Sequence, residues 1–182
     1  LDDTYAGVPI KDISAVLGAL RMIKSPFEIE VMKEAGQIAG AMMAAAHGSL
    51  KVGAQEYESA LAVIEAGSGW DRFVSPMIHN LQILQSGKDT SMVHRRASVK
   101  KYALADPVYF CFCNMAQFKQ YKLGFDRMFH VGEVKDDAAR VQEAAIAAQQ
   151  AAIAAIRPGV LAQDVAAAAN AVYDERGYAT GY

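Results

Sequence analysis

Three residues that could bind a charged small molecule alternate along the stretch 121–130 (YKLGFDRMFH). Side chains of a strand point in turn to its two faces, so Lys122, Gly124 and Asp126 would share one face of that strand. A glycine inside a strand often marks a place where a ligand approaches the backbone, and Lys122 and Asp126 would then flank a small cavity. The pattern also fits a solvent-exposed sheet face with one weak charge pair, because such alternation is the common antiparallel arrangement.

A histidine that could act as a general base follows the stretch QSGKDTSMV (85–93), which is rich in turn-forming residues. His94 is followed directly by Arg95 and Arg96, and nearby cations lower the proton affinity of an imidazole. An imidazole that is neutral at physiological pH can take a proton from a reacting group. A histidine without a catalytic role is the alternative that these residues leave open.

Two cysteines, Cys111 and Cys113, lie two residues apart in a stretch with apolar residues at both parities. Strand geometry puts them on the same face, where such close neighbours are poorly placed to form a disulfide. They could be soft metal ligands if His130 came close, but the spacing lacks the usual zinc pattern. We expect free, buried thiols and a reducing, cytoplasmic location.

Helices and strands that would hold these residues follow from periodicity and capping signals. Helices are expected over 13–23, from Ser25 to about Ala46, and over 55–65, 136–156 and 162–176, with strands and connections over 70–131. The end of that region, 108–132, is predicted to form two strands joined by a turn. Ser25, Pro26 and Glu28 form a capping box with proline at the first helical position. Behind this start, an apolar stripe is expected at Ile29, Met32, Gly36, Ala39, Met43 and Ala46.

The two helical parts repeat one another. Lys51-Val52-Gly53 and Arg157-Pro158-Gly159 each separate a pair of helices, and each is followed by an Ala-Gln-acid sequence. Such repetition predicts an internally duplicated α+β domain in which paired helices back a sheet. The second part lacks strands that would correspond to 70–131, so we expect an incomplete domain.

Composition limits the classes of partner. The 182 residues carry a formal net charge of −2 and are 53% hydrophobic, which is typical of a globular enzyme-sized domain. Nucleic acid is not an expected partner, because phosphate binding needs clustered Lys and Arg. No apolar run is long enough to cross a bilayer, and no secretory signal, phosphate-binding glycine loop or His-Glu-x-x-His motif is present.

Five segments, in chain order, resemble the creatinase/aminopeptidase P/prolidase family. They are ALRMIKSPFEIEVMKEAGQIAGAMMAAA, QSGKDTSMVH, ADPVYFCF, DRMFHVG and AIRPGVLAQDVAAAANAVYDERGY, and they run from about Leu20 to Gly177. The resemblance implies the pita-bread fold, a duplicated α+β domain. It also implies that 1–24 is a linker with a short helix following an N-terminal domain. Residues 25–182 would then be a partial catalytic domain whose C-terminal strands carry further site residues.

The resemblance also bears on metal binding. Peptidases of this family carry metal-binding aspartates where this sequence has Cys111 and, within about one residue, Gly124. A pair of divalent cations needs bridging oxygen ligands, which a thiol and a bare backbone do not supply. We therefore predict no metal and no cofactor.

Creatinase-type members of the family imply the roles of the remaining site residues. His94 aligns with a general-base histidine, and Asp106 follows it at the family's interval. Asp126 aligns with a substrate-binding glutamate and would bind a cationic group. Lys122 aligns, within a residue or two, with a substrate-facing tyrosine of those members, and a cation there suggests a substrate with a carboxylate rather than creatine.

The resulting prediction is a metal-independent, creatinase-like hydrolase of a C–N bond in a small zwitterionic nitrogen compound. A metal-dependent Xaa-Pro aminopeptidase or dipeptidase is the first alternative, and a non-catalytic pita-bread binding module is the second. The resemblance also implies a homodimer.

Overall fold

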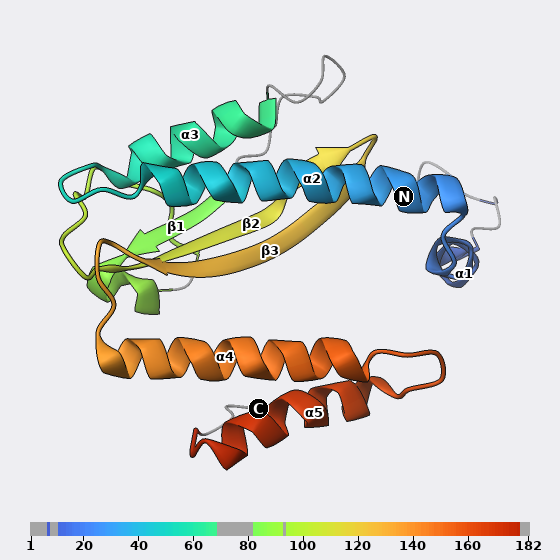
Figure 1. The fold of residues 1–182 in the computed structure, drawn as a ribbon. Coiled ribbons are helices and arrows are strands. Elements are labelled where there is room, and N and C mark those ends of the chain that lie inside the picture. Colours follow the sequence, from blue (N-terminus) through green and yellow to red (C-terminus); the bar gives the residue numbers. More distant parts are fainter. Residues whose placement is uncertain (1–6, 8–10, 69–81, 93, 179–182) are drawn as a thin grey trace.

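The computed structural model describes residues 7, 11–68, 82–92 and 94–178 (Figure 1). Its elements are α1 (Ser14–Met22), α2 (Pro26–Ser49), α3 (Glu56–Ser68), β1 (Gln82–Ser86), the 3-10 helix η1 (Gly87–Ser91), β2 (Pro107–Phe118), β3 (Tyr121–His130), α4 (Asp136–Ala155) and α5 (Ala162–Glu175). All five expected helices are present. The part of the expected strand region at 70–81, including His79, lies outside the described residues.

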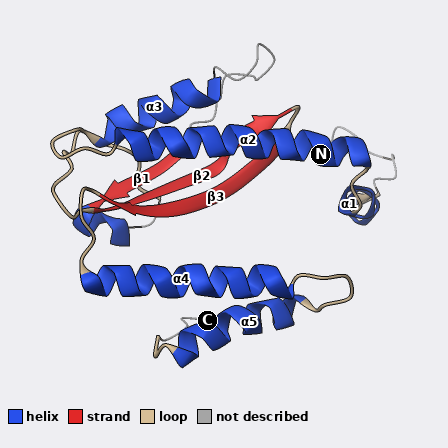
Figure 2. Cartoon of the chain, in the orientation of Figure 1, coloured by secondary structure: helices blue, strands red, loops and turns tan. Residues whose placement is uncertain are grey.

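A three-stranded antiparallel sheet in the order β1-β2-β3 is the centre of the fold. Helices α2 and α3 cover one of its faces, and the α4–α5 pair lies on the other side (Figures 1 and 2). This arrangement confirms the predicted α+β class. None of the described helices combines the length and the hydropathy needed to cross a bilayer.

Helix α2 begins as its capping signal predicts. The Ser25 hydroxyl accepts from the Glu28 amide at 3.3 Å, and the Ser25 amide donates to Glu28 Oε2 at 2.7 Å. Pro26 occupies the first helical position, where its missing N–H costs no hydrogen bond. These contacts satisfy backbone donors that a helix start otherwise leaves without partners.

The core lies between α2 and the sheet, but the buried stripe of α2 differs from the expected one. Its buried members are Val31, Ala35, Ile38, Ala39, Met42 and Ala46. Only Ala39 and Ala46 belong to the predicted stripe, and Ile29 is exposed. Alanine, glycine and methionine occur on several sides of this helix, so its hydropathy pattern does not identify the face that is buried. The larger side chains Ile38 and Met42 fill the space above β2.

The hairpin β2–β3 is regular except at one irregularity. Residue pairs run from Pro107↔His130 to Phe112↔Phe125, and the register then shifts before Ala116↔Leu123. Lys119 and Gln120 both have positive φ, 47° and 69°, as a two-residue type I′ turn requires. The predicted pair of strands joined by a turn is therefore confirmed.

The repeated turn sequences share a backbone conformation. Gly53 and Gly159, at φ 87° and 84°, occupy the left-handed region between α2 and α3 and between α4 and α5. Ala144 and Ala148 are the buried residues of α4, where small side chains allow close approach to α5. The two helix pairs are thus built alike, in agreement with the predicted internal repeat.

Candidate active site

One face of the hairpin points away from the core and carries most of the candidate residues. Val108, Phe110 and Phe112 are fully buried toward α2, whereas the intervening Cys111 is half-buried. Cys111 stands directly opposite Asp126 in the register. Thiol and carboxylate therefore lie side by side on the face that the alternation predicted.

Asp126 has a hydrogen-bond partner that the sequence reasoning missed. The Tyr109 hydroxyl donates to Asp126 Oδ2 at 2.7 Å. Burial, followed by this hydrogen bond and the Asp126 charge, raises the pKa of Tyr109 well above its usual value. Tyr109 therefore stays protonated and orients the carboxylate. Its position two residues before Cys111, and so on the same strand face, was the available signal.

The two thiols are closer than the sequence suggested. Cys111 Sγ and Cys113 Sγ lie 3.2 Å apart, and both cysteines are free. Both cysteines share a face in a regular strand, and the register of β2 with β3 shifts between Phe112 and Ala116, so the strand is not regular at Cys113. Burial, with a contribution from the Cys113 hydrogen bond, raises the pKa of Cys111 to about 11. The Cys111 thiol is therefore protonated at neutral pH.

A pocket of about 460 Å³ opens beside Asp126. Tyr109, Asp126 and Met128 of the sheet line one side, while Gln149 of α4 and Tyr173 of α5 line the other. Its lining combines the Asp126 carboxylate and the neighbouring Arg127 with aromatic and amide groups. Its size is that of a small-molecule site.

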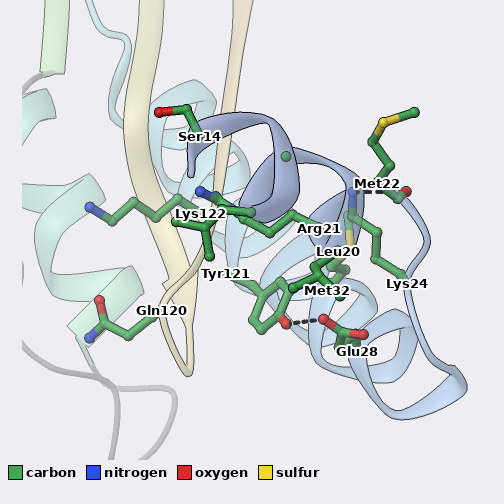
Figure 3. Close-up of a pocket in the computed structure, with 12 residues that line it drawn as sticks. Ser14, Leu20, Arg21, Met22, Lys24, Glu28, Met32, Gln120, Tyr121 and Lys122 are labelled. Carbon is green, nitrogen blue, oxygen red and sulfur yellow. Dashed lines mark hydrogen bonds between the residues drawn. The ribbon is translucent and has the colours of Figure 1, made fainter. Parts of the chain in front are cut away.

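Lys122 lies on the same strand as Asp126 but lines a different pocket. That pocket, of about 1130 Å³, lies between α1, the start of α2 and the β2–β3 turn (Figure 3). There the Tyr121 hydroxyl donates to Glu28, while the Lys122 side chain extends away from this pair. The Tyr121 and Ser25 hydrogen bonds lower the pKa of Glu28 to about 2. The structure does not bring Lys122 and Asp126 around one described cavity.

His94 lies after η1, in an exposed position with φ 58°. The neighbouring Arg95 forms an ion pair with the buried Asp89, and its carbonyl accepts from the Leu84 amide at 3.2 Å. Part of the positive charge expected beside His94 is therefore neutralised by Asp89. No described contact joins His94 to Asp126.

Asp106 supports the turn before β2 and lies beside the start of η1. Its Oδ2 accepts from the Ala103 amide at 2.9 Å. Its Oδ1 lies 2.9 Å from where a Cβ on Gly87 would stand, and Gly87 has φ 58°. Only glycine satisfies both the backbone conformation and this close approach.

Comparisons with known proteins identify the family. The model described as "Metallopeptidase family M24" matches residues 30–182. The chain is 27% identical to the creatinase of Bacillus sp. over 96% of its own length and 43% of that protein, and 23% identical to the ectoine hydrolase of Halomonas elongata over 93% and 44%. The chain therefore belongs to metallopeptidase family M24, and it spans under half the length of these curated relatives.

Solved structures agree with this assignment. The prolidase from Pyrococcus furiosus superposes with a TM-score of 0.80 at 27% identity, over 92% of this chain and 48% of that one. Dipeptidase PepE from Mycobacterium ulcerans gives a TM-score of 0.80 at 28% identity, over 97% and 46%. The predicted pita-bread fold and family are confirmed, and these relatives are hydrolases, the predicted class of enzyme.

The family name implies metal ions, so the donor set of the hairpin face can be tested against them. Divalent metals bind carboxylates, imidazoles and deprotonated thiols. This face offers the single thiol of Cys111 and the Asp126 carboxylate, which already accepts from Tyr109. His130 pairs with Pro107 at the far end of the ladder. Within the described ranges no three such side chains could hold an ion, so these residues do not fit a dinuclear centre.

Proposed function

We propose that the whole protein is a metal-independent hydrolase that cleaves a C–N bond in a small zwitterionic nitrogen compound. The observation that carries the proposal is the hairpin face: one carboxylate, Asp126, stands beside a protonated thiol and a bare glycine backbone. Such a face is better suited to an organic cation than to paired metal ions.

The names of the curated relatives support a small substrate. Creatinase and ectoine hydrolase are named for small nitrogen-containing molecules rather than for peptides. The pocket beside Asp126, about 460 Å³, agrees with a ligand of that size. Lys122, exposed on the same strand, lines the other pocket, so we propose no contact between it and a small ligand bound beside Asp126.

The proposed chemistry assigns one role to each residue. His94 takes a proton from water while the water oxygen attacks the carbon of the scissile C–N bond. When that bond breaks, the proton passes to the leaving nitrogen. General-base assistance of this kind contributes roughly 10²–10⁴-fold, so binding and orientation by Asp126 must supply much of the rest.

A metal-dependent Xaa-Pro peptidase is the second candidate, because the solved neighbours are named prolidase and dipeptidase. Elemental analysis of the purified full-length protein, with activity measured before and after EDTA, separates the two. We expect no stoichiometric metal and unchanged turnover. Loss of activity on EDTA that added metal restores would contradict the metal-independent mechanism and favour the metal-dependent candidate.

A thermal-shift screen with amidino and betaine-like compounds tests whether the pocket binds small molecules. A ligand that binds the folded state raises the melting temperature in proportion to the logarithm of its concentration over Kd. Stabilisation by such a compound supports the hydrolase, while a flat screen together with absent turnover favours a non-catalytic binding module. We also propose that the protein is a homodimer, which light scattering on the full-length protein checks, and that it is located in the cytoplasm.

A further inference from the structure

The backbone around His94 is held by a buried carboxylate on the element before it. Asp89, in η1, is 5% exposed and forms an ion pair with the Arg95 guanidinium. Lys100 Nζ lies 3.6 Å from the same carboxylate. Because Arg95 also accepts from the Leu84 amide through its carbonyl, both its side chain and its backbone are fixed against the sheet edge.

A second buried carboxylate holds the chain a few residues further on. Glu56, the fully buried residue that opens α3, accepts from the Ser86 hydroxyl at 2.7 Å. Its other oxygen accepts from the Ser98 amide at 3.0 Å and from the Ser98 hydroxyl at 2.6 Å. The backbone continues this contact, because the Tyr57 amide donates to the Ser98 carbonyl at 3.1 Å.

The conformation of His94 itself requires such a support. Its φ of 58° is in the left-handed region, which is costly for a residue with a side chain and persists where the surroundings determine it. The nearest fixed point is Arg95, the next residue, whereas Ser98 is four residues away. Loss of the Arg95 anchor should therefore release His94, and loss of the Ser98 anchor should not.

We propose that Asp89 is a positioning residue for His94 and acts through the Arg95 guanidinium. Glu56 anchors the same stretch of chain at Ser98 and contributes to stability rather than to the placement of the imidazole. The positioning role rests on the proposed function, in which His94 is the general base. The structural part of the claim, that Asp89 fixes the backbone at 94–95, can be measured without any substrate.

Amide hydrogen exchange on the full-length protein tests the structural part, with Asp89→Asn and Glu56→Gln as a matched pair. In Asp89→Asn the Leu84 amide should lose protection roughly ten- to a hundredfold, as expected for loss of a hydrogen bond to a charged group, while Tyr57 is unchanged. In Glu56→Gln the Tyr57 amide should lose protection while the Leu84 amide is unchanged. If Asp89→Asn folds poorly, Arg95→Gln takes its place and should show the same loss of protection at Leu84. Compared with Arg95→Gln, Arg95→Lys should regain part of that protection.

The imidazole of His94 gives the second readout. Its NMR signals, assigned by their absence in His94→Asn, should shift in Asp89→Asn and stay in place in Glu56→Gln. With an amidino or betaine-like compound that wild type hydrolyses, Asp89→Asn should lower kcat roughly 100-fold at little change in KM, since small displacements of a catalytic group have effects of that size.

The outcomes separate the two claims. Unchanged Leu84 protection and unchanged His94 signals in Asp89→Asn would overturn the positioning role. Equal loss of protection at Leu84 and Tyr57 in both variants would also overturn it, because it would show general loosening. Full turnover in His94→Asn would instead reject the proposed function and leave the exchange result standing.

Discussion

The β2–β3 hairpin and the residues around His94 hold their candidate groups in place by different means. Asp126 stands on a regular strand, where the ladder fixes its direction and one hydrogen bond from Tyr109 orients the carboxylate. His94 lies outside any helix or strand, and its neighbour Arg95 is tied by an ion pair to a buried acid. Repetitive backbone geometry places the first group, and an irregular network of charges places the second.

In the proposed mechanism, the group placed by the strand, Asp126, binds the substrate, and the group placed by the charge network, His94, takes part in the reaction. A strand position tolerates substitution of its exposed side chain, because main-chain groups form the ladder and a cross-strand side-chain pair contributes only roughly 0.2–1 kcal/mol. A position held by an ion pair to a buried acid does not, because removal of Asp89 frees the Arg95 side chain that fixes this stretch of chain. Substitutions in the two regions should therefore have different effects on catalysis, on binding and on stability.

The largest effect is expected at His94. His94→Asn removes the base but keeps a residue that tolerates the left-handed conformation, so the backbone should be retained. We expect kcat to fall roughly 10²–10⁴-fold, with the melting temperature close to that of wild type. Steady-state kinetics and thermal unfolding of the full-length variant check this. A kcat within about twofold of the wild-type value would remove His94 from the mechanism.

The next largest effect is expected at Asp126. Asp126→Asn removes a charge that binds the cationic end of the substrate, and KM should rise roughly 10- to 100-fold with a smaller change in kcat. Lys122→Gln is the matched control, a charge removed from an exposed position of the same strand, and KM should change little because Lys122 lines another pocket. Equal KM values for wild type and Asp126→Asn would show that the hairpin face does not bind substrate.

The regular parts of the molecule were predictable from sequence, and the network was not. The capping box at Ser25, the hairpin and the alternation around Gly124 depend on neighbours within a few residues. Glu56 and Asp89 join residues 30 to 42 positions apart or cross a turn, and no periodicity encodes such contacts. They become visible only when α3, β1 and the residues after η1 are brought together.

Neither the buried face of α2 nor the Tyr109–Asp126 contact could be predicted from the sequence, and the reasons differ. An alanine-rich helix has no sharp polar side, so its orientation is decided by where Ile38 and Met42 fit against the sheet. Tyr109 was overlooked because a tyrosine between apolar residues resembles ordinary packing. The hairpin register, Tyr109 opposite Met128 and Cys111 opposite Asp126, shows the cross-strand diagonal that joins Tyr109 to Asp126.

Cysteine reactivity provides a further test of the hairpin face. Because the pKa of Cys111 is raised to about 11, its thiolate is scarce at pH 8 and alkylation by iodoacetamide should be roughly tenfold slower than for a free thiol. The rate should rise toward pH 11. The raised pKa also means that the protonated thiol contributes to the stability of the folded state. This contribution is fully present below the thiol's ordinary pKa and is lost as the pH rises through about 11. Mass spectrometry with Cys111→Ser as control assigns the modified residue; rapid labelling at pH 8 would contradict a protonated thiol.

The smallest effect is expected at the start of α2, which contacts the hairpin turn through Tyr121. Ser25→Ala should lower the free energy of unfolding by about 1 kcal/mol and leave kcat unchanged, because a helix cap supports the scaffold without touching either candidate group. Glu28→Gln adds a pH test. The Tyr121 and Ser25 hydrogen bonds lower the pKa of Glu28 to about 2, so their stabilisation is present above the ordinary pKa of 4.5 and is lost as the pH falls through about 2.

Urea unfolding of wild type and Glu28→Gln at several pH values measures this loss. The difference between the two proteins should be constant above about pH 5 and should shrink steadily between the ordinary and the lowered pKa. A difference that does not change with pH would mean that Glu28 acts through packing rather than through its charge. A fall in kcat in either variant would mean that the start of α2 is coupled to the His94 region, and the separation of scaffold from site would then have to be redrawn to include the hairpin turn.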